Sequence, residues 1–185
     1  MPRAYISVGS NLDRENNILQ AMHFLSQDVS VINLSLFYRT EPLNRPGQPD
    51  FYNGVVSIET EILPGDLKYQ VLRRIENKLG RVRSTDKYAS RGIDLDILLY
   101  DQQVIHNEIL DIPDPDILKR PFLVLPLYEL NPELILPEWN RPIREIAEEL
   151  SNIKMIPLTV FTDKLRRNLK DGHRKGGEFN PKTAD

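Results

Sequence analysis

Apolar residues in this chain switch between a period of two and a period near four, and the order of the switches limits the folds open to it. Stretches rich in alternating, β-branched and aromatic residues are typical of strands. Four of them predict strands at residues 4–8, 31–37, 52–60 and 93–100. The proline-bearing segment from Thr40 to Asp50 predicts a long loop between the second and third strands.

Two segments between the predicted strands have apolar residues at helical spacing. The first predicted helix begins at an N-cap, Asp13, and runs to about Gln27. The second follows Pro64, which suits a first helical turn, and ends before Gly80. Its apolar face repeats at strict intervals of four, at Leu67, Val71, Ile75 and Leu79.

The elements therefore follow the order strand, helix, strand, strand, helix, strand. This order predicts an α+β fold with a ferredoxin-like βαββαβ core, in which helices cover one face of an antiparallel sheet. A proline-rich segment follows, with seven prolines from Pro113 to Pro142, and then a further helix from Ile143 to Leu150. Such an order serves many functions, so it does not identify one.

Composition narrows the class of protein. The 185 residues match one ordinary domain, and the lack of cysteine excludes disulfide and thiolate chemistry and fits a reducing compartment. Because no apolar run has the length of a signal peptide or a membrane span, we expect a cytoplasmic protein without a membrane partner. The formal net charge of -3 argues against a protein that binds nucleic acid by overall attraction to phosphate.

Charge is distributed unevenly along the chain. Residues 163–185 hold seven basic and four acidic groups, which leaves a net charge of -6 on residues 1–162. Few apolar residues follow Asn168. We therefore expect residues 1–162 to form the functional domain and residues 163–185 to form a basic, disordered tail.

The densest positive charge lies between Arg73 and Arg91, where seven basic side chains accompany two acidic ones. The planar fork of arginine matches phosphate oxygens, so several arginines beside a loop that begins at Gly80 predict a clamp for a polyphosphate. A solvated helix end followed by a charged loop would explain the same composition. The segment alone does not decide between the two.

Two carboxylates follow directly. Alternation places Ile93, Leu95, Ile97 and Leu99 on a core face, and it places Asp94 and Asp96 together on the other face. Neighbouring carboxylates repel unless a cation lies between them, and magnesium binds through one or two carboxylates plus substrate phosphates. Such a pair is common on exposed strands, but beside the arginines it predicts a magnesium-dependent nucleotide-transfer site.

The run from Lys87 to Leu98, KYASRGIDLDIL, resembles the signature of the 6-hydroxymethyl-7,8-dihydropterin pyrophosphokinase family of folate biosynthesis. The resemblance covers roughly residues 4–150. It includes GSNL at residues 9–12, FYRTEPL at 37–43, QPDFYN at 48–53 and RPF at 120–122. It implies transfer of a pyrophosphoryl group from ATP, the co-substrate, to the hydroxymethyl oxygen of the pterin, with release of AMP.

The resemblance also implies roles for single residues. Asp94 and Asp96 would hold two Mg²⁺ ions. The other catalytic and ATP-binding residues would be Arg81, Arg91, Glu76, Arg83, Tyr88, Asp114 and Arg120. The pterin would be held by Thr40, Pro42, Leu43 and Asn53 and stacked between two rings, Phe51 and Phe122.

The chain departs from the family pattern at Asp114, where many members have a histidine that faces the triphosphate. A carboxylate there adds repulsion to phosphate, so a pterin- or nucleotide-binding relative with impaired catalysis stays an alternative. An RNA-binding module with the same strand order is a more distant alternative, because residues 52–58 lack the exposed aromatic run of such modules. The expected partners are therefore ATP and a hydroxymethyl pterin, without nucleic acid, and the sequence leaves the oligomeric state open.

Overall fold

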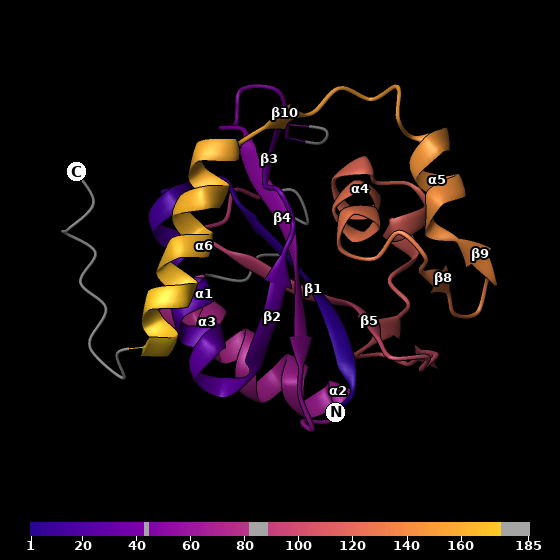
Figure 1. Cartoon of the computed structure of the whole chain (residues 1–185). Coiled ribbons are helices and arrows are strands. Elements are labelled where there is room, and N and C mark those ends of the chain that lie inside the picture. Colours follow the sequence, from indigo (N-terminus) through magenta and orange to yellow (C-terminus); the bar gives the residue numbers. More distant parts are fainter. Residues whose placement is uncertain (43–44, 82–88, 175–185) are drawn as a thin grey trace.

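The computed structural model describes residues 1–42, 45–81 and 89–174, with side chains up to Lys170. Its main sheet has six strands, and every pairing in it is antiparallel. The strand order is β10-β3-β4-β1-β5, with β2 also paired to β4 (Figure 1). The strands are β1 (Arg3–Ser10), β2 (Ser30–Leu34), β3 (Tyr38–Thr40), β4 (Phe51–Glu59), β5 (Asp94–Tyr100) and β10 (Ile156–Pro157). The four predicted strands and the antiparallel sheet are thus confirmed, and β3 and β10 are additional.

The first predicted helix is α1 (Arg14–Asp28). Asp13 is its N-cap residue, although its carboxylate accepts a hydrogen bond from the Asn16 side chain rather than from a helix N–H. The second predicted helix is continuous but changes its winding, from α2 (Pro64–Asp66) through a π-helical turn, η1 (Leu67–Leu72), to α3 (Arg73–Lys78). Both helices pack on the face of the sheet that carries Ala4, Ile6 and Val8.

The π-helical turn explains how a strict interval of four keeps one face buried. In an α-helix four residues turn through about 400°, so such a face drifts by about 40° at each step. The wider i→i+5 turn of η1 rotates the chain less per residue and offsets this drift. Leu67, Val71 and Ile75 are accordingly all buried.

Helices also cover the second face of the sheet, which corrects the prediction that they lie on one face. Tyr5, Val55 and Leu99 point away from α1 and pack against α4 (Pro121–Leu130) and α5 (Ile143–Glu149). Figure 1 shows α4 and α5 on one side of the sheet and α1, α3 and α6 on the other. The connections to these helices contain η2 (Pro115–Leu118) and two small hairpins, β6 (Ile105–His106) with β7 (Asp111–Ile112) and β8 (Ile135–Leu136) with β9 (Arg141–Pro142).

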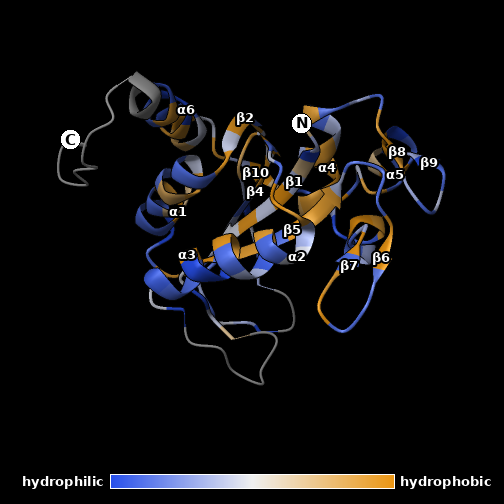
Figure 2. Ribbon diagram, turned by 90° about the horizontal axis from the view of Figure 1, so that it is seen from below, coloured by the Kyte–Doolittle hydropathy of each residue, from blue (hydrophilic) through white to orange (hydrophobic). Residues whose placement is uncertain are grey.

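Helix α4 gives little signal in the sequence. It carries Pro126 in its interior, and its residues are apolar almost all round, so no period of 3.6 stands out. Figure 2 shows this helix almost uniformly hydrophobic, in contrast to the outer faces of α1 and α3. A uniformly apolar helix is typical of an element buried on several sides, and α4 lies between the sheet and α5.

Strand β5 departs from simple alternation at its end. Tyr5 and Ile6 of β1 are adjacent, yet they pair with Leu99 and Ile97, so Leu98 is an extra residue in the ladder. A bulge of this kind reverses the side-chain order beyond it. The prediction that Leu99 shares the face of Leu95 and Ile97 is therefore wrong, because Leu99 packs against α4 and α5 instead.

Residues 163–174 form most of α6 (Thr159–Arg174), which corrects the expectation that a disordered tail begins at residue 163. Three apolar residues with helical spacing, Phe161, Leu165 and Leu169, pack into the core beneath α1. Their pattern crosses the boundary that charge alone suggested. Residues 175–185 of the expected tail lie outside the described residues. No helix within the described ranges is both long and apolar enough to cross a membrane.

Candidate active site

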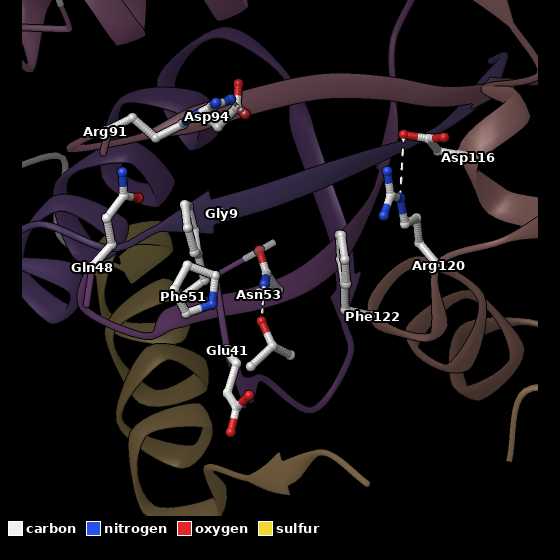
Figure 3. A pocket seen from close by; sticks show the side chains of 12 residues that line it. Gly9, Glu41, Gln48, Phe51, Asn53, Arg91, Asp94, Asp116, Arg120 and Phe122 are labelled. Atoms are coloured by element: carbon white, nitrogen blue, oxygen red, sulfur yellow. Dashed lines mark hydrogen bonds and ion pairs between the residues drawn. The ribbon is translucent and has the colours of Figure 1, made fainter. Parts of the chain in front are cut away.

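A cavity of about 390 Å³ opens at the end of the sheet where β1 ends and where β4 and β5 begin. Figure 3 shows Phe51 and Phe122 on opposite sides of it, with Asn53 between them, and charged side chains along another wall. Eight of the predicted site residues line it: Thr40, Pro42, Phe51, Asn53, Arg91, Asp94, Arg120 and Phe122. Four residues without a predicted role line it as well: Gly9, Glu41, Gln48 and Asp116.

Asp94 is the centre of the charged wall. Arg81 and Arg91 each donate through Nη1 to a different oxygen of its carboxylate. Burial alone would raise the pKa of Asp94, but the two guanidinium groups lower it below its ordinary value. Asp94 is therefore a fixed negative charge between two cations, each of which has donors suited to phosphate.

Glu76 supports this arrangement from α3. Its side chain is 1% exposed, and it accepts hydrogen bonds from Arg81 and, at 2.9 Å, from the backbone N–H of Leu95. Burial raises the pKa of Glu76, while the Leu95 N–H and the Arg81 charge act in the opposite direction. Glu76 does not line the cavity. Its hydrogen bond with Arg81 orients that guanidinium group, and a contact of Glu76 with ATP stays a prediction.

Asp96, the second predicted metal ligand, is paired with Lys68 of η1. The Lys68 Nζ also donates to the carbonyl oxygen of Leu95 at 3.3 Å. Lys68 has no role predicted from the sequence. The signal was present only in three dimensions, because 27 residues separate Lys68 from Leu95.

The wall opposite the charges is built around Asn53. Its Nδ2 donates to Thr40 Oγ1 at 2.7 Å, which joins β4 to β3 at the predicted pterin edge. Gly9 lies against this amide, and a Cβ at Gly9 would come within 2.7 Å of Asn53 Oδ1. A glycine at this position therefore leaves space for the Asn53 side chain beside the cavity.

The GSNL segment joins the two walls through Asn11, whose side chain is 1% exposed. Asn11 exchanges two hydrogen bonds with the backbone of Arg91: its N–H donates at 3.1 Å and its Oδ1 accepts at 2.7 Å. Its Nδ2 donates to the carbonyl of Pro49 at 3.3 Å, two residues before Phe51. One buried amide thus fixes the loop before Asp94 against the loop before Phe51.

A second set of hydrogen bonds fixes the distance between β3 and α4. Glu129 of α4 accepts hydrogen bonds from the hydroxyl of Tyr38 and, at 2.9 Å, from the backbone N–H of Leu36. Because Thr40 lies on β3 and Phe122 on the first turn of α4, this contact holds two sides of the cavity together.

Asp114 lies near this cavity but does not line it. It caps η2, accepting from the backbone N–H of Asp116 at 2.8 Å, and its own N–H donates to the carbonyl of Leu98 at 2.9 Å. The pKa of Asp114 is raised to about 6, mainly by burial and also by the charges of Asp116, Asp96 and Asp111, while the hydrogen bond from the Asp116 N–H acts in the opposite direction. Its neighbour Asp116 lines the cavity and pairs with Arg120 at 3.6 Å.

The remaining predicted residues fall outside what is described. The family resemblance implies roles for Leu43, Arg83 and Tyr88, and these three residues lie outside the described part of the chain. The others divide into the cavity lining and a layer behind it, formed by Glu76 and Arg81. Asp96 and Asp114 lie beside the lining, on β5 and at η2.

The donor set at β5 fits a metal that is only partly coordinated by protein. Among the described residues no group of three or more carboxylate, histidine or cysteine side chains is arranged to hold a metal ion. Two carboxylates alone suit magnesium, which commonly keeps waters and binds substrate phosphates as its other ligands. Asp94 and Asp96, beside three cationic side chains, have this composition.

Comparison with known protein families supports a site that binds a pterin and a nucleotide. Residues 5–132 match the model of the 7,8-dihydro-6-hydroxymethylpterin-pyrophosphokinase (HPPK) family, which is more than half of the chain. The chain belongs to this family. The expected family, and with it the enzyme class of a pyrophosphokinase, is confirmed.

Curated relatives of the HPPK family support the assignment along most of the chain. A 2-amino-4-hydroxy-6-hydroxymethyldihydropteridine pyrophosphokinase of Haemophilus influenzae is 41% identical over 161 residues, 85% of this chain and 99% of that protein. One of Aquifex aeolicus is 34% identical over 150 residues, 80% of this chain and 92% of that protein. The folic acid synthesis protein fol1 of Schizosaccharomyces pombe is 37% identical over 150 residues, but these are only 20% of its length.

Solved structures resemble the fold at low sequence identity. A crystal structure of wild-type Plasmodium falciparum HPPK-DHPS with pterin and p-hydroxybenzoate superposes with a TM-score of 0.64 at 17% identity. The match covers 92% of this chain and 44% of that one, so this chain spans less than half of the longer protein. At this identity the likeness shows the fold alone, a mixed helical structure with an antiparallel sheet.

Proposed function

We propose that the cavity is the site at which a pyrophosphoryl group passes from ATP to the hydroxymethyl oxygen of 6-hydroxymethyl-7,8-dihydropterin, with release of AMP. One observation carries this proposal: Asp94 and Arg91 line the same cavity as Phe51 and Phe122, and Arg81 pairs with Asp94 from behind this lining. A polyphosphate and a flat heteroaromatic ring need these two kinds of surface side by side. The family membership supplies the substrate class.

The charged wall would receive the triphosphate. Arg81 and Arg91, which neutralise Asp94 in the structure, have further N–H donors for phosphate oxygens. Asp94 and Asp96 would hold magnesium, and we propose two ions. Bound there, magnesium would neutralise charge on the phosphates, while the carboxylates fix where that charge is placed.

Phe51, Phe122, Asn53 and Thr40, which we call the ring wall, would orient the pterin. Phe51 and Phe122 lie on opposite sides of the cavity, so a flat ring between them would be stacked on both faces (Figure 3). Stacking of this kind contributes about 1 to 3 kcal/mol per ring by analogy with bases on aromatic side chains. Asn53 and Thr40 would then hydrogen-bond the ring edge, and together these contacts direct the hydroxymethyl group toward the phosphates.

The reaction requires little covalent chemistry from the protein. The hydroxymethyl oxygen would attack the β-phosphorus of ATP, the bond from that phosphorus to the AMP oxygen would break, and AMP would leave. Holding the two substrates in line and neutralising charge supply most of the rate in such transfers. The residues assigned above serve these two purposes, since none of them is placed to form a covalent intermediate.

We also propose the finer fold assignment. The order β2-β4-β1-β5, with α1 and the α2–α3 segment as the two crossover connections, agrees with a ferredoxin-like core. The helices α4 and α5 on the second face would be additions to that core. ATP and the pterin would be the partners, with no nucleic acid among them.

The test is to incubate the protein with ATP, magnesium and 6-hydroxymethyl-7,8-dihydropterin and to measure AMP. Stoichiometric AMP that depends on the pterin is the expected result. Binding of both ligands in calorimetry without AMP release would instead establish the impaired relative to which Asp114 points. A panel of pterin alcohols in the same assay defines the preferred substrate.

A further inference from the structure

Lys68 closes the open edge of the sheet beside the proposed metal site. β5 is an edge strand, paired on one side with β1, so its other side has unpaired backbone groups. Two side chains from the η1–α3 segment satisfy the backbone of one residue there. Glu76 accepts from the N–H of Leu95, and Lys68 donates to the carbonyl oxygen of Leu95.

These contacts hold the Lys68 ammonium in place. The Lys68 side chain is only 12% exposed, which is low for a lysine, and Leu67, Val71 and Leu72 of the same π-helical turn are buried. From this position its Nζ makes a direct ion pair with Asp96 Oδ1. An ordinary surface lysine would have its charge in water, whereas this one is directed at a single carboxylate.

The two carboxylates of β5 are therefore neutralised by different residues. Asp94 is paired with Arg81 and Arg91, and among the described residues Lys68 is the cation paired with Asp96. Together with Glu76, the three acids and three bases give the cluster no formal net charge. A neutral cluster has little long-range attraction for a free divalent cation. A lone pair of Asp96 that is engaged by an ammonium must also be released before it can coordinate a metal.

We propose that Lys68 is a positioning residue whose ammonium stays paired with the Asp96 carboxylate until a metal ion displaces it. As a consequence, the site binds its metal together with the nucleotide rather than alone. This inference rests on the proposed function, in which Asp96 is a magnesium ligand. The incoming phosphates add the negative charge that both the metal and the released ammonium can face. Lys68 thereby favours the ordered arrival of ATP with its metal over binding of a free cation.

A purely structural role for Lys68 gives a different expectation. If Lys68 only caps the edge of β5, its removal lowers the free energy of unfolding and leaves metal affinity unchanged or weaker. If Lys68 competes with the metal, its removal strengthens the binding of a free cation. The direction of the change in metal affinity therefore separates the two roles.

The experiment measures Mn²⁺ binding without nucleotide, by calorimetry and by the electron paramagnetic resonance signal of free Mn²⁺. Lys68→Met should bind Mn²⁺ about tenfold more tightly than the unchanged protein, because an ion pair of this exposure is worth about one factor of ten. Lys68→Arg keeps the charge and should stay within twofold. Lys154→Met removes an exposed lysine outside the site and should leave Mn²⁺ affinity unchanged.

Two further variants distinguish failure of this inference from failure of the proposed function. Adding Asp96→Asn to Lys68→Met should abolish the gain. If the gain persists, Asp96 is not the ligand, and its role in the proposed function is overturned. If folded Lys68→Met binds Mn²⁺ no more tightly, while Asp96→Asn alone weakens Mn²⁺ binding with a non-hydrolysable ATP analogue, the inference about Lys68 is overturned and the metal site stands.

Discussion

The two walls of the cavity differ in how they are encoded. The charged wall and the layer behind it come from one part of the chain, which runs from η1 to β5. Its residues are Lys68, Glu76, Arg81, Arg91 and Asp94. The ring wall combines a segment around β3 and β4 with the first turn of α4, some 70 residues later. The residues of the charged wall are therefore close in sequence. The ring wall forms only when α4 packs on the second face of the sheet and brings Phe122 to the cavity.

The walls also differ in how they are held. The charged wall consists of ion pairs among side chains of α3, of β5 and of the connection between them. The ring wall depends on ties between distant elements, such as Glu129 to Tyr38 and Asn11 to the carbonyl of Pro49. A stacking site is sensitive to the separation of its rings, so it needs such ties, whereas Coulomb interactions fall off more gradually with distance.

The largest effect is expected at the centre of the charged wall. Asp94→Asn keeps the shape but removes the charge between Arg81 and Arg91 and one proposed metal ligand. We expect the rate of AMP release at saturating substrates to fall about 1000-fold or more, because such electrostatic groups contribute on this scale. Pterin affinity should change less than threefold if the walls act separately.

The matched control for this variant is Glu145→Gln, an exposed carboxylate on α5. It removes the same charge far from the cavity and should leave the rate unchanged. AMP release by Asp94→Asn within fivefold of the unchanged protein would remove Asp94 from the reaction centre.

A smaller effect is expected on the ring wall, and it should change the affinity for the pterin rather than the rate. Phe122→Ala removes one of the two rings proposed to stack on the pterin, so the KM for the pterin should rise about 10- to 100-fold. The KM for ATP should stay within threefold, since Phe122 lies across the cavity from the charged cluster. Phe122→Tyr keeps the ring and serves as the control, measured in the same steady-state assay. Equal increases in both KM values would show that the walls are not independent.

This contrast explains how much of the site the sequence predicts. Asp94 and Asp96 stand two apart in a strand beside a run of arginines, so their grouping follows from local periodicity and charge. Phe51 and Phe122 are individually ordinary aromatic residues, and only the family resemblance brings them together. Lys68 has no sequence signal, and Asn11 lies in the GSNL run of the resemblance without a predicted role. Each acts through a backbone group of a distant segment, which the sequence does not show.

The fold shows the same division. Strands and helices with a clear period were predicted, including α5, which begins at Ile143. α4 was missed because Pro126 and a uniformly apolar surface conceal its period, and with it the second layer of helices was missed. The face of Leu99 was wrong because one bulged residue, Leu98, is determined by pairing with β1 and not by the composition of β5.

The smallest effect concerns Asp114, on the segment that leads from β5 toward α4. Its pKa is raised to about 6 in the folded protein, against an ordinary value of 3.8. The folded state therefore holds the proton more tightly than the unfolded state does. The contribution of Asp114 to stability is therefore highest below pH 4, falls as the pH rises from about 4 to 6, and then stays lower by about 3 kcal/mol.

Asp114→Asn should remove this penalty and keep the cap, because an asparagine oxygen accepts from the Asp116 N–H as an aspartate oxygen does. In urea unfolding at pH 7.5, we expect the variant to be more stable than the unchanged protein by about 3 kcal/mol. The difference should shrink to well under 1 kcal/mol at pH 4, and the exposed control Glu108→Gln should show no such dependence. A constant difference at both pH values would mean that shape, not charge, is what Asp114 contributes. The segment around Asp114 would then tolerate the ionised carboxylate, and its charge would not weaken the folded state.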